Sequence, residues 1–249
     1  PISDAPGNTL TLRDGTTLQS TGASVTLGAS QNVILDGTGG TVDTAGGATG
    51  TLEFTAVVSG HDCAPLTKTG AGQLVLSAAN TYAGGTTVAA GTLVVANATG
   101  SATGSGSLTM AAGTTLAGNG LITAAAGNAI TLGGSLNPGL PGSSASGLVS
   151  LAVSGAGTLS FGGVTLDLLA NTGDNPAASN DRVMVLASDW SNVLFNGTLD
   201  VVTALDTASW VNGDRWQVFD WSGIASGTIA TSGLAWASWT SLPLVRVRE

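Results

Sequence analysis

The stretch that decides the fold runs from Leu66 to Val95 and reads LTKTGAGQLVLSAANTYAGGTTVAAGTLVV. Apolar residues alternate in two short segments, Gln73–Ser77 and Thr92–Val95, and more weakly in a third, Thr86–Ala89. Alternate side chains of a strand point to opposite faces, and Gly or Asn permits the positive φ of the turns between such strands. Strands this short cannot cover their own apolar face, so we expect similar strands elsewhere in the chain to cover them.

The composition indicates an all-β protein. Of the 249 residues, 38 are glycine and only 8% are charged. Lys68 is the only lysine, and Glu53 and Glu249 are the only glutamates. A solvated helix surface needs many such side chains. We therefore expect strands and turns whose surface is built from Thr, Ser, Asn and Asp.

The charge and the apolar pattern exclude two kinds of partner. The net charge of −9 argues against binding to nucleic acid, which requires clustered Lys and Arg. No apolar run approaches the length of a membrane-spanning helix. The sequence starts at Pro1 rather than Met, and we expect an exported, extracellular or cell-surface protein whose leader is not part of this chain.

Short apolar segments return about every eight residues along the chain, which with three strands per coil predicts coils of roughly 20–25 residues. A β-sandwich also has closely spaced strands, but it needs bulky residues between its two sheets. Before residue 163 the only aromatic residues are Phe54, Tyr82 and Phe161. A narrow interior of stacked Leu, Val, Ile and Ala favours a right-handed parallel β-helix (β-solenoid), predicted here for residues 1–165.

The composition changes after about residue 164. All six tryptophans lie in the last quarter of the chain, at Trp190, Trp210, Trp216, Trp221, Trp236 and Trp239. Longer strands are predicted at Arg182–Ala187, Thr198–Val202, Arg215–Asp220 and Leu242–Arg248. The open end of a solenoid exposes unpaired strand edges. We therefore predict that residues 166–249 form a Trp-rich β cap, an assembly segment or a small domain.

The central stretch resembles the autotransporter-associated β-strand repeat of bacterial passenger domains and large surface proteins. The residues that carry the resemblance are Leu66, Lys68, Gly70, Gly72, Leu74, Leu76, Asn80, Thr81, Tyr82, Gly84, Thr86, Val88, Gly91 and Leu93. The resemblance covers one clear repeat, Leu66–Leu93. It implies a parallel β-helix that is exported and displayed, with the repeat acting as a stalk and no particular activity attached to it.

The residues that could carry chemistry do not form a convincing site. His61–Asp62–Cys63 brings the only His and the only Cys together with a carboxylate, but neighbouring residues on a strand or turn point in different directions. We read this triplet as a loop at one corner of the solenoid. An intermolecular disulfide through Cys63 is a lesser hypothesis. We predict no catalytic residue, no metal ion and no cofactor.

The aspartates raise the possibility of a carbohydrate-cleaving enzyme. Asp14, Asp36 and Asp43 could stack on adjacent coils, and glycoside hydrolysis uses two carboxylates. Asp-Gly is, however, ordinary turn chemistry, and the solenoid lacks the aromatic platforms and basic residues of a sugar cleft. A polysaccharide lyase or hydrolase is therefore the third hypothesis.

The first hypothesis is a secreted structural protein, a subunit of an extracellular filament, stalk or surface layer that assembles head to tail with itself. The residues predicted to pair between subunits are Leu10 and Leu12 near the start and Leu242, Leu244, Val245 and Val247 near the end. The second hypothesis is an adhesin that binds surface glycans or a host surface through Trp236 and Trp239.

Overall fold

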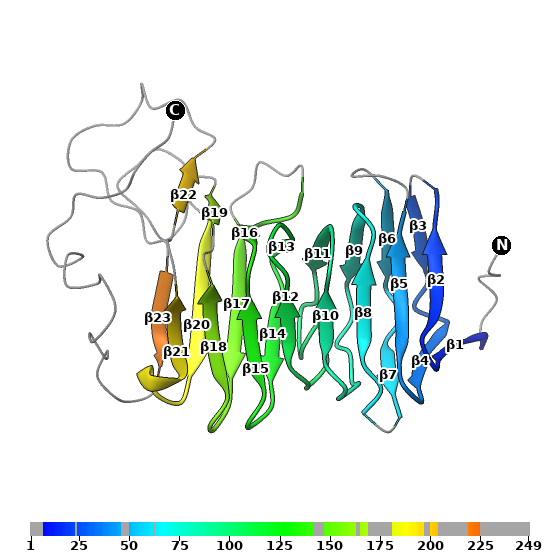
Figure 1. Cartoon of the computed structure of the whole chain (residues 1–249), viewed down its shortest axis with the longest axis horizontal. Coiled ribbons are helices and arrows are strands. Elements are labelled where there is room, and N and C mark those ends of the chain that lie inside the picture. The colour runs from blue at the N-terminus through cyan, green and yellow to red at the C-terminus, as the bar shows by residue number, and fades with distance from the viewer. Residues whose placement is uncertain are drawn as a thin grey trace, which may run out of the picture.

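The computed structural model describes residues 7–22, 24–45, 50–61, 63–141, 147–162, 165–168, 181–196, 200–203 and 219–224. Within these ranges the chain is all-β, and its helical content is one short 3-10 turn, η1 (Trp190–Asn192). Successive strands do not pair with each other. Each pairs in parallel with the strand one coil earlier and one coil later, which produces a three-sided solenoid whose coils advance along the long axis (Figure 1).

Two faces of the solenoid are eight-stranded parallel sheets. The first face consists of β2 (Thr16–Ser20), β5 (Gly40–Thr44), β8 (Leu66–Thr69), β10 (Thr86–Val88), β12 (Leu108–Met110), β15 (Ala129–Leu132), β18 (Thr158–Gly162) and β21 (Val193–Asn196). The second face consists of β3 (Ser24–Leu27), β6 (Thr51–Phe54), β9 (Gln73–Leu76), β11 (Thr92–Val95), β13 (Thr115–Gly118), β16 (Ser135–Pro138), β19 (Thr165–Leu168) and β22 (Asp200–Thr203).

The third face is divided into two smaller sheets. The first holds β1 (Thr9–Arg13), β4 (Asn32–Asp36) and β7 (Val58–Gly60), and the second holds β14 (Leu121–Ala124), β17 (Leu148–Val153), β20 (Arg182–Ala187) and β23 (Phe219–Ile224). Two irregular segments, around residues 80–82 and 101–103, lie between them. The amides of Thr81, Asn80 and Ala102 donate to the carbonyls of Val58, Ser101 and Leu121 at 2.9 Å each, so backbone hydrogen bonds cross the gap.

The register confirms the predicted solenoid and the strands of the central stretch. Gln73 pairs with Thr92 and Leu74 with Leu93, so one coil here takes 19 residues (73 to 92). Further along, Leu166 pairs with Val201, and the coil takes 35 residues (166 to 201). The coil length predicted from the spacing of apolar segments therefore holds in the middle of the molecule. It fails toward the C-terminal end, where the connections between strands are longer.

The core is a set of stacked rows of inward-facing side chains. On the second face, Leu52, Leu74, Leu93, Leu116 and Leu136 follow each other through five coils, and all are buried. Fully burying one such side chain contributes about 1.5–3 kcal/mol, so each coil is stabilised by its two neighbours. The three early aromatic residues are all part of this core: Phe54, Tyr82 and Phe161.

The sheets continue past residue 165, where the sequence suggested that the solenoid ends. Strand β19 adds to the second face and β20 to the third, and β23 pairs with β20 in turn. The strand predicted at Arg182–Ala187 is confirmed as β20, while the predictions at Thr198–Val202 and Arg215–Asp220 overlap β22 and β23. The change of composition therefore does not end the stacking.

The segment Leu242–Arg248 lies outside the described residues, and the Trp-rich cap stays a prediction. In the part of the chain that the structure describes, no helix has the length and apolar character needed to cross a membrane.

Candidate functional site

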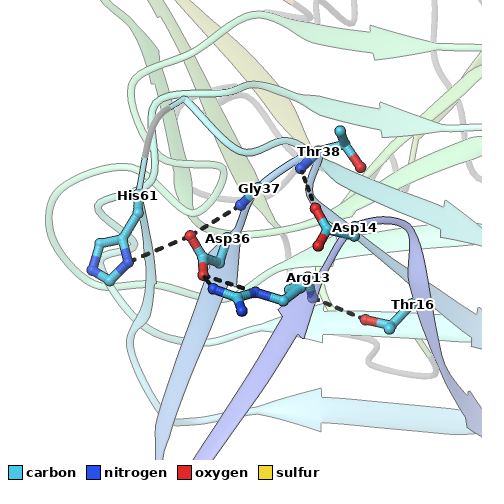
Figure 2. A network of polar contacts seen from close by, with 7 residues as sticks. All are labelled: Arg13, Asp14, Thr16, Asp36, Gly37, Thr38 and His61. Atoms are coloured by element: carbon cyan, nitrogen blue, oxygen red, sulfur yellow. Dashed lines mark hydrogen bonds and ion pairs between the residues drawn. The ribbon is translucent and has the colours of Figure 1, made fainter.

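Three charged side chains line up on consecutive coils at one corner of the solenoid (Figure 2). Arg13 pairs in register with Asp36 at the ends of β1 and β4. The amide of His61 donates to the carbonyl of Leu35 at 2.9 Å, which places His61 beside Asp36 on the next coil. Parallel stacking without offset thus creates a row of alternating charge, Arg13–Asp36–His61.

Asp36 is the centre of this row. Arg13 donates to Asp36 Oδ2 through Nη2 and, at 3.1 Å, through Nε, while His61 Nδ1 lies 3.7 Å from Asp36 Oδ1. The Arg13 hydrogen bond, followed by the amide of Gly37, holds the pKa of Asp36 below its usual range. The same ion pair raises the pKa of Arg13. Asp36 therefore stays ionised and committed to its partner, the opposite of what a general acid requires.

The structure brings Asp14 and Asp36 to this corner but leaves Asp43 elsewhere. Asp14 adopts φ 54° in its turn, and its Oδ1 accepts a bond from the amide of Thr38 at 3.4 Å. Asp43 instead accepts a bond from Gln19 Nε2 at 2.8 Å across the first face. These carboxylates serve turns and the pairing of coils, as Asp-Gly turn chemistry predicts.

An open recess of about 400 Å³ lies over the corner and is lined by Thr11, Arg13, Thr16, Ile34, Asp36 and His61. Arg13 and His61 are largely exposed there. Among the described residues, no group of three or more His, Cys, Asp or Glu side chains is arranged to hold a metal ion. The corner offers a water-exposed ion pair rather than a catalytic constellation.

The loop after β7 holds the triplet that the sequence singled out. His61 joins the charged row, Asp62 lies outside the described residues, and Cys63 is exposed with φ 59°. The triplet occupies the corner between β7 and β8, as predicted. The intermolecular disulfide of Cys63 stays a prediction.

The residues predicted for assembly and ligand binding are only partly visible. Leu12 is buried and Leu10 packs against the core while remaining partly exposed. Leu242, Leu244, Val245, Val247, Trp236 and Trp239 lie outside the described residues. Their assigned roles stay predictions.

A buried lysine is the most unusual feature of the central coil. Lys68 is completely buried, and its Nζ donates to the carbonyls of Thr69 and Gly70 at 2.8 Å each and of Ala90 at 3.0 Å. We took Lys68 as part of the scarce solvated charge of the chain. The alternation of β8 was a signal against that reading, because Leu66 faces inward and Lys68, two residues later, must face the same way.

Asparagine side chains replace strand pairing on the third face. Asn80 Oδ1 accepts a bond from the amide of Val58 at 2.7 Å, and Asn80 Nδ2 donates to the carbonyl of Ala102 at 2.5 Å. Asn97 does the same one coil later, with its Oδ1 accepting from the amide of Leu121 at 3.1 Å and its Nδ2 donating to the carbonyl of the same residue at 3.0 Å. Each amide bridges two coils where no β-strand is present.

Tyr82 fills the core beneath these bridges. Its side chain is fully buried, and its hydroxyl shares a 2.6 Å hydrogen bond with Thr86 Oγ1. A Cβ on Gly60, one coil earlier, would lie 2.7 Å from Tyr82 Cβ, so the glycine leaves the space that the ring occupies. Burial raises the pKa of the Tyr82 phenol.

These contacts fall within the part of the chain that a protein family describes. The family model of the passenger-associated-transport-repeat matches residues 66–95 of the 249. This match confirms the resemblance noted in the sequence and indicates a passenger-type surface protein. A repeat of this kind implies export to the cell surface, and passenger repeats are usually structural or adhesive. Neither the curated proteins nor the solved structures compared with the chain give a match.

Proposed function

We propose that this chain is a structural rod of the bacterial cell surface, a stalk or filament subunit whose coils set the distance between its two ends. The observation that carries the proposal is the unbroken stacking of two eight-stranded parallel sheets around one core. Each coil contacts mainly its neighbours, so length is added one coil at a time. The exposed ion pair at Arg13 and Asp36 adds no reactive group to this design.

The N-terminal coil supports end-to-end assembly. Among the described residues, β1, β2 and β3 each pair with a strand on one side only. The inward-facing Leu10 and Leu18 of this coil are only partly buried, and Val25 is 39% exposed. Their partners one coil later, Val33, Val42 and Leu52, are buried. Open strand edges over a partly exposed core accept another parallel coil readily.

The predicted partner is a second copy of the chain, with the segment that contains Leu242, Leu244, Val245 and Val247 adding strands beyond β1. Such a head-to-tail contact does not close on itself, so repetition gives a filament. An adhesin is the alternative, in which the rod stays single and surface glycans bind at its Trp-rich end.

Negative-stain electron microscopy of the purified chain at several concentrations tests the proposal. We expect filaments whose length increases with concentration, and deletion of residues 242–249 should leave single rods. Single short rods at every concentration would overturn the filament and favour the adhesin. Unchanged assembly after the deletion would reject the predicted contact segment.

A matched pair of charge variants locates the interface. Val25→Lys places an ammonium at the open N-terminal coil, whereas Val57→Lys places one at a valine that is 47% exposed in the third coil. We expect Val25→Lys to abolish filaments and Val57→Lys to preserve them. Equal behaviour of the two variants would show that the N-terminal coil is not the interface.

A further inference from the structure

The position of Lys68 in the core is an exception to the row in which it lies. In register, the inward row on the first face reads Val42, Lys68, Val88, Met110 and Leu132. All the others are apolar and buried. A buried ammonium is costly unless hydrogen-bond acceptors surround it, so this coil must provide them.

The acceptors come from two successive coils at the same corner. Thr69 and Gly70 follow β8 in one coil, and Ala90 follows β10 in the next. An ammonium has three N–H donors, and the three carbonyl oxygens lie at 2.8–3.0 Å from Nζ. Each donor therefore has one acceptor, and the nitrogen connects the two coils.

Gly91 closes the site from the next residue along. Its φ is +73°, and a Cβ there would lie 2.9 Å from Lys68 Nζ and 2.4 Å from the carbonyl oxygen of Gly70. Only glycine allows the chain to pass so close to the nitrogen with this backbone conformation. Lys68, Gly70 and Gly91 are thus required together, because the site needs a donor, an acceptor and the space between them.

We propose that the carbonyls of Thr69, Gly70 and Ala90 form a cation site specific for a primary ammonium, and that Lys68 is its built-in ligand, which fixes one coil on the next. Burial lowers the pKa of Lys68 to about 8, with Asp43 of the adjacent β5 opposing this shift. The site therefore holds an ammonium at neutral pH and exchanges it for a neutral amine in mildly alkaline solution.

The intact protein provides the first test, because Lys68 is its only lysine and gives one assignable side-chain signal. We would measure the exchange of the Nζ protons with water by ¹H–¹⁵N NMR at neutral pH. The matched control is Thr109→Lys, which adds a lysine at an exposed position of β12. The proposal expects the Lys68 protons to exchange at least about tenfold more slowly than those of the added lysine, since opening of the core limits them. Equal exchange rates would overturn it.

Chemical replacement of the ligand is the second test. Lys68→Ala removes a propylammonium group, so we would compare its Tm in n-propylammonium chloride and in tetramethylammonium chloride, which has no N–H donor. The expected result is a Tm several degrees lower than that of the wild type, restored in part by n-propylammonium alone. The same Tm in both salts would reject an ammonium-specific site. If Lys68→Ala does not fold, the exchange measurement on the intact chain still decides the question.

Discussion

Asn80 shows how one side chain stabilises the solenoid where a strand is absent. It provides an acceptor to Val58 and a donor to Ala102, and all three residues are buried. The irregular segment at residues 80–82 therefore keeps the same coil-to-coil distance as the strands on either side of it. A polar side chain replaces part of the backbone ladder here.

Asn80→Ala should destabilise the protein more than its size suggests. The change leaves the amide of Val58 and the carbonyl of Ala102 buried without these partners, and an unsatisfied buried polar group costs about 1–3 kcal/mol. We expect the free energy of unfolding to fall by about 2–4 kcal/mol in urea denaturation. Thr109→Ala, an exposed control on β12, should change it by less than about 0.5 kcal/mol. A loss below about 1 kcal/mol for Asn80→Ala would show that the bridge contributes little.

Lys68 makes stability depend on pH in an unusual direction. Its pKa is lowered by burial from 10.5 to about 8, so between these values the unfolded chain holds one proton more than the folded chain. The free energy of unfolding should therefore rise as the pH increases from 8 toward 10, by roughly 1–3 kcal/mol. Denaturation in urea at a series of pH values measures this. Lys68→Met, which keeps an unbranched side chain without the titrating group, should remove the rise.

Tyr82 sets the upper limit of that rise. Burial raises the pKa of its phenol above the ordinary value of about 10. The neutral phenol is thus favoured in the folded chain, and the stability it contributes is complete below about pH 10 and is lost as the pH increases further. Tyr82→Phe should retain stability in that alkaline range better than the wild type, measured relative to pH 8. A decline of equal size in both proteins would assign it to other groups.

At the scale of single elements, the turns are constrained by the coil beneath them. Gly84 ends the irregular segment before β10, and a Cβ there would lie 1.9 Å from the carbonyl oxygen of Cys63 and 2.3 Å from the carbonyl carbon of Ala64. Both are backbone atoms of the preceding coil, so they cannot move aside as a flexible side chain does. The glycine is required for close stacking.

Gly84→Ala should push adjacent coils apart. We expect a loss of at least about 3 kcal/mol, in the range of severe packing defects. Gly22→Ala is the matched control, because the nearest atom to its added Cβ is Val25 Cγ2 at 3.8 Å. It should leave the free energy of unfolding nearly unchanged. Comparable losses in the two variants would point to backbone entropy rather than to the contact with the preceding coil.

The strands of this fold were predictable because their pattern is local. The alternation in Thr92–Val95 and the glycines around it predict β11 residue for residue, and Arg182–Ala187 predicts β20 equally well. The role of Lys68 depends on carbonyl groups 22 residues away along the chain, and that of Asn80 on coils before and after it. No alternation rule contains such contacts, although the inward position of Lys68 is implied by Leu66.

The charged corner illustrates the same limit. Arg13, Asp36 and His61 are 23 and 25 residues apart in sequence (13 to 36, 36 to 61), and unequal coil lengths hide their alignment until the register is known. The sequence directed attention to His61 for its proximity to Cys63. The structure gives it a different neighbour, Asp36.

At the scale of the whole molecule, a solenoid should open from its ends. The strands β1, β2 and β3 have partners on one side among the described residues, and Val25 is 39% exposed, whereas the inward residues of the central coil are buried on both sides. In a quasi-one-dimensional structure the terminal coil lacks one of its two stacking interfaces and unfolds at lower free energy.

Hydrogen exchange measured by mass spectrometry checks this directly. For the single rod, at a concentration too low for filaments, we expect backbone amides of residues 9–27 to exchange at least about a hundredfold faster than those of residues 66–95, since about 3 kcal/mol separates the two openings. In filaments the N-terminal peptides should become protected while those of the central coil stay unchanged, because the predicted contact gives β1 a second partner. Protection that is equal in both regions of the single rod would mean that the molecule unfolds as one cooperative unit. Filaments without added protection at residues 9–27 would place the contact between copies elsewhere on the rod.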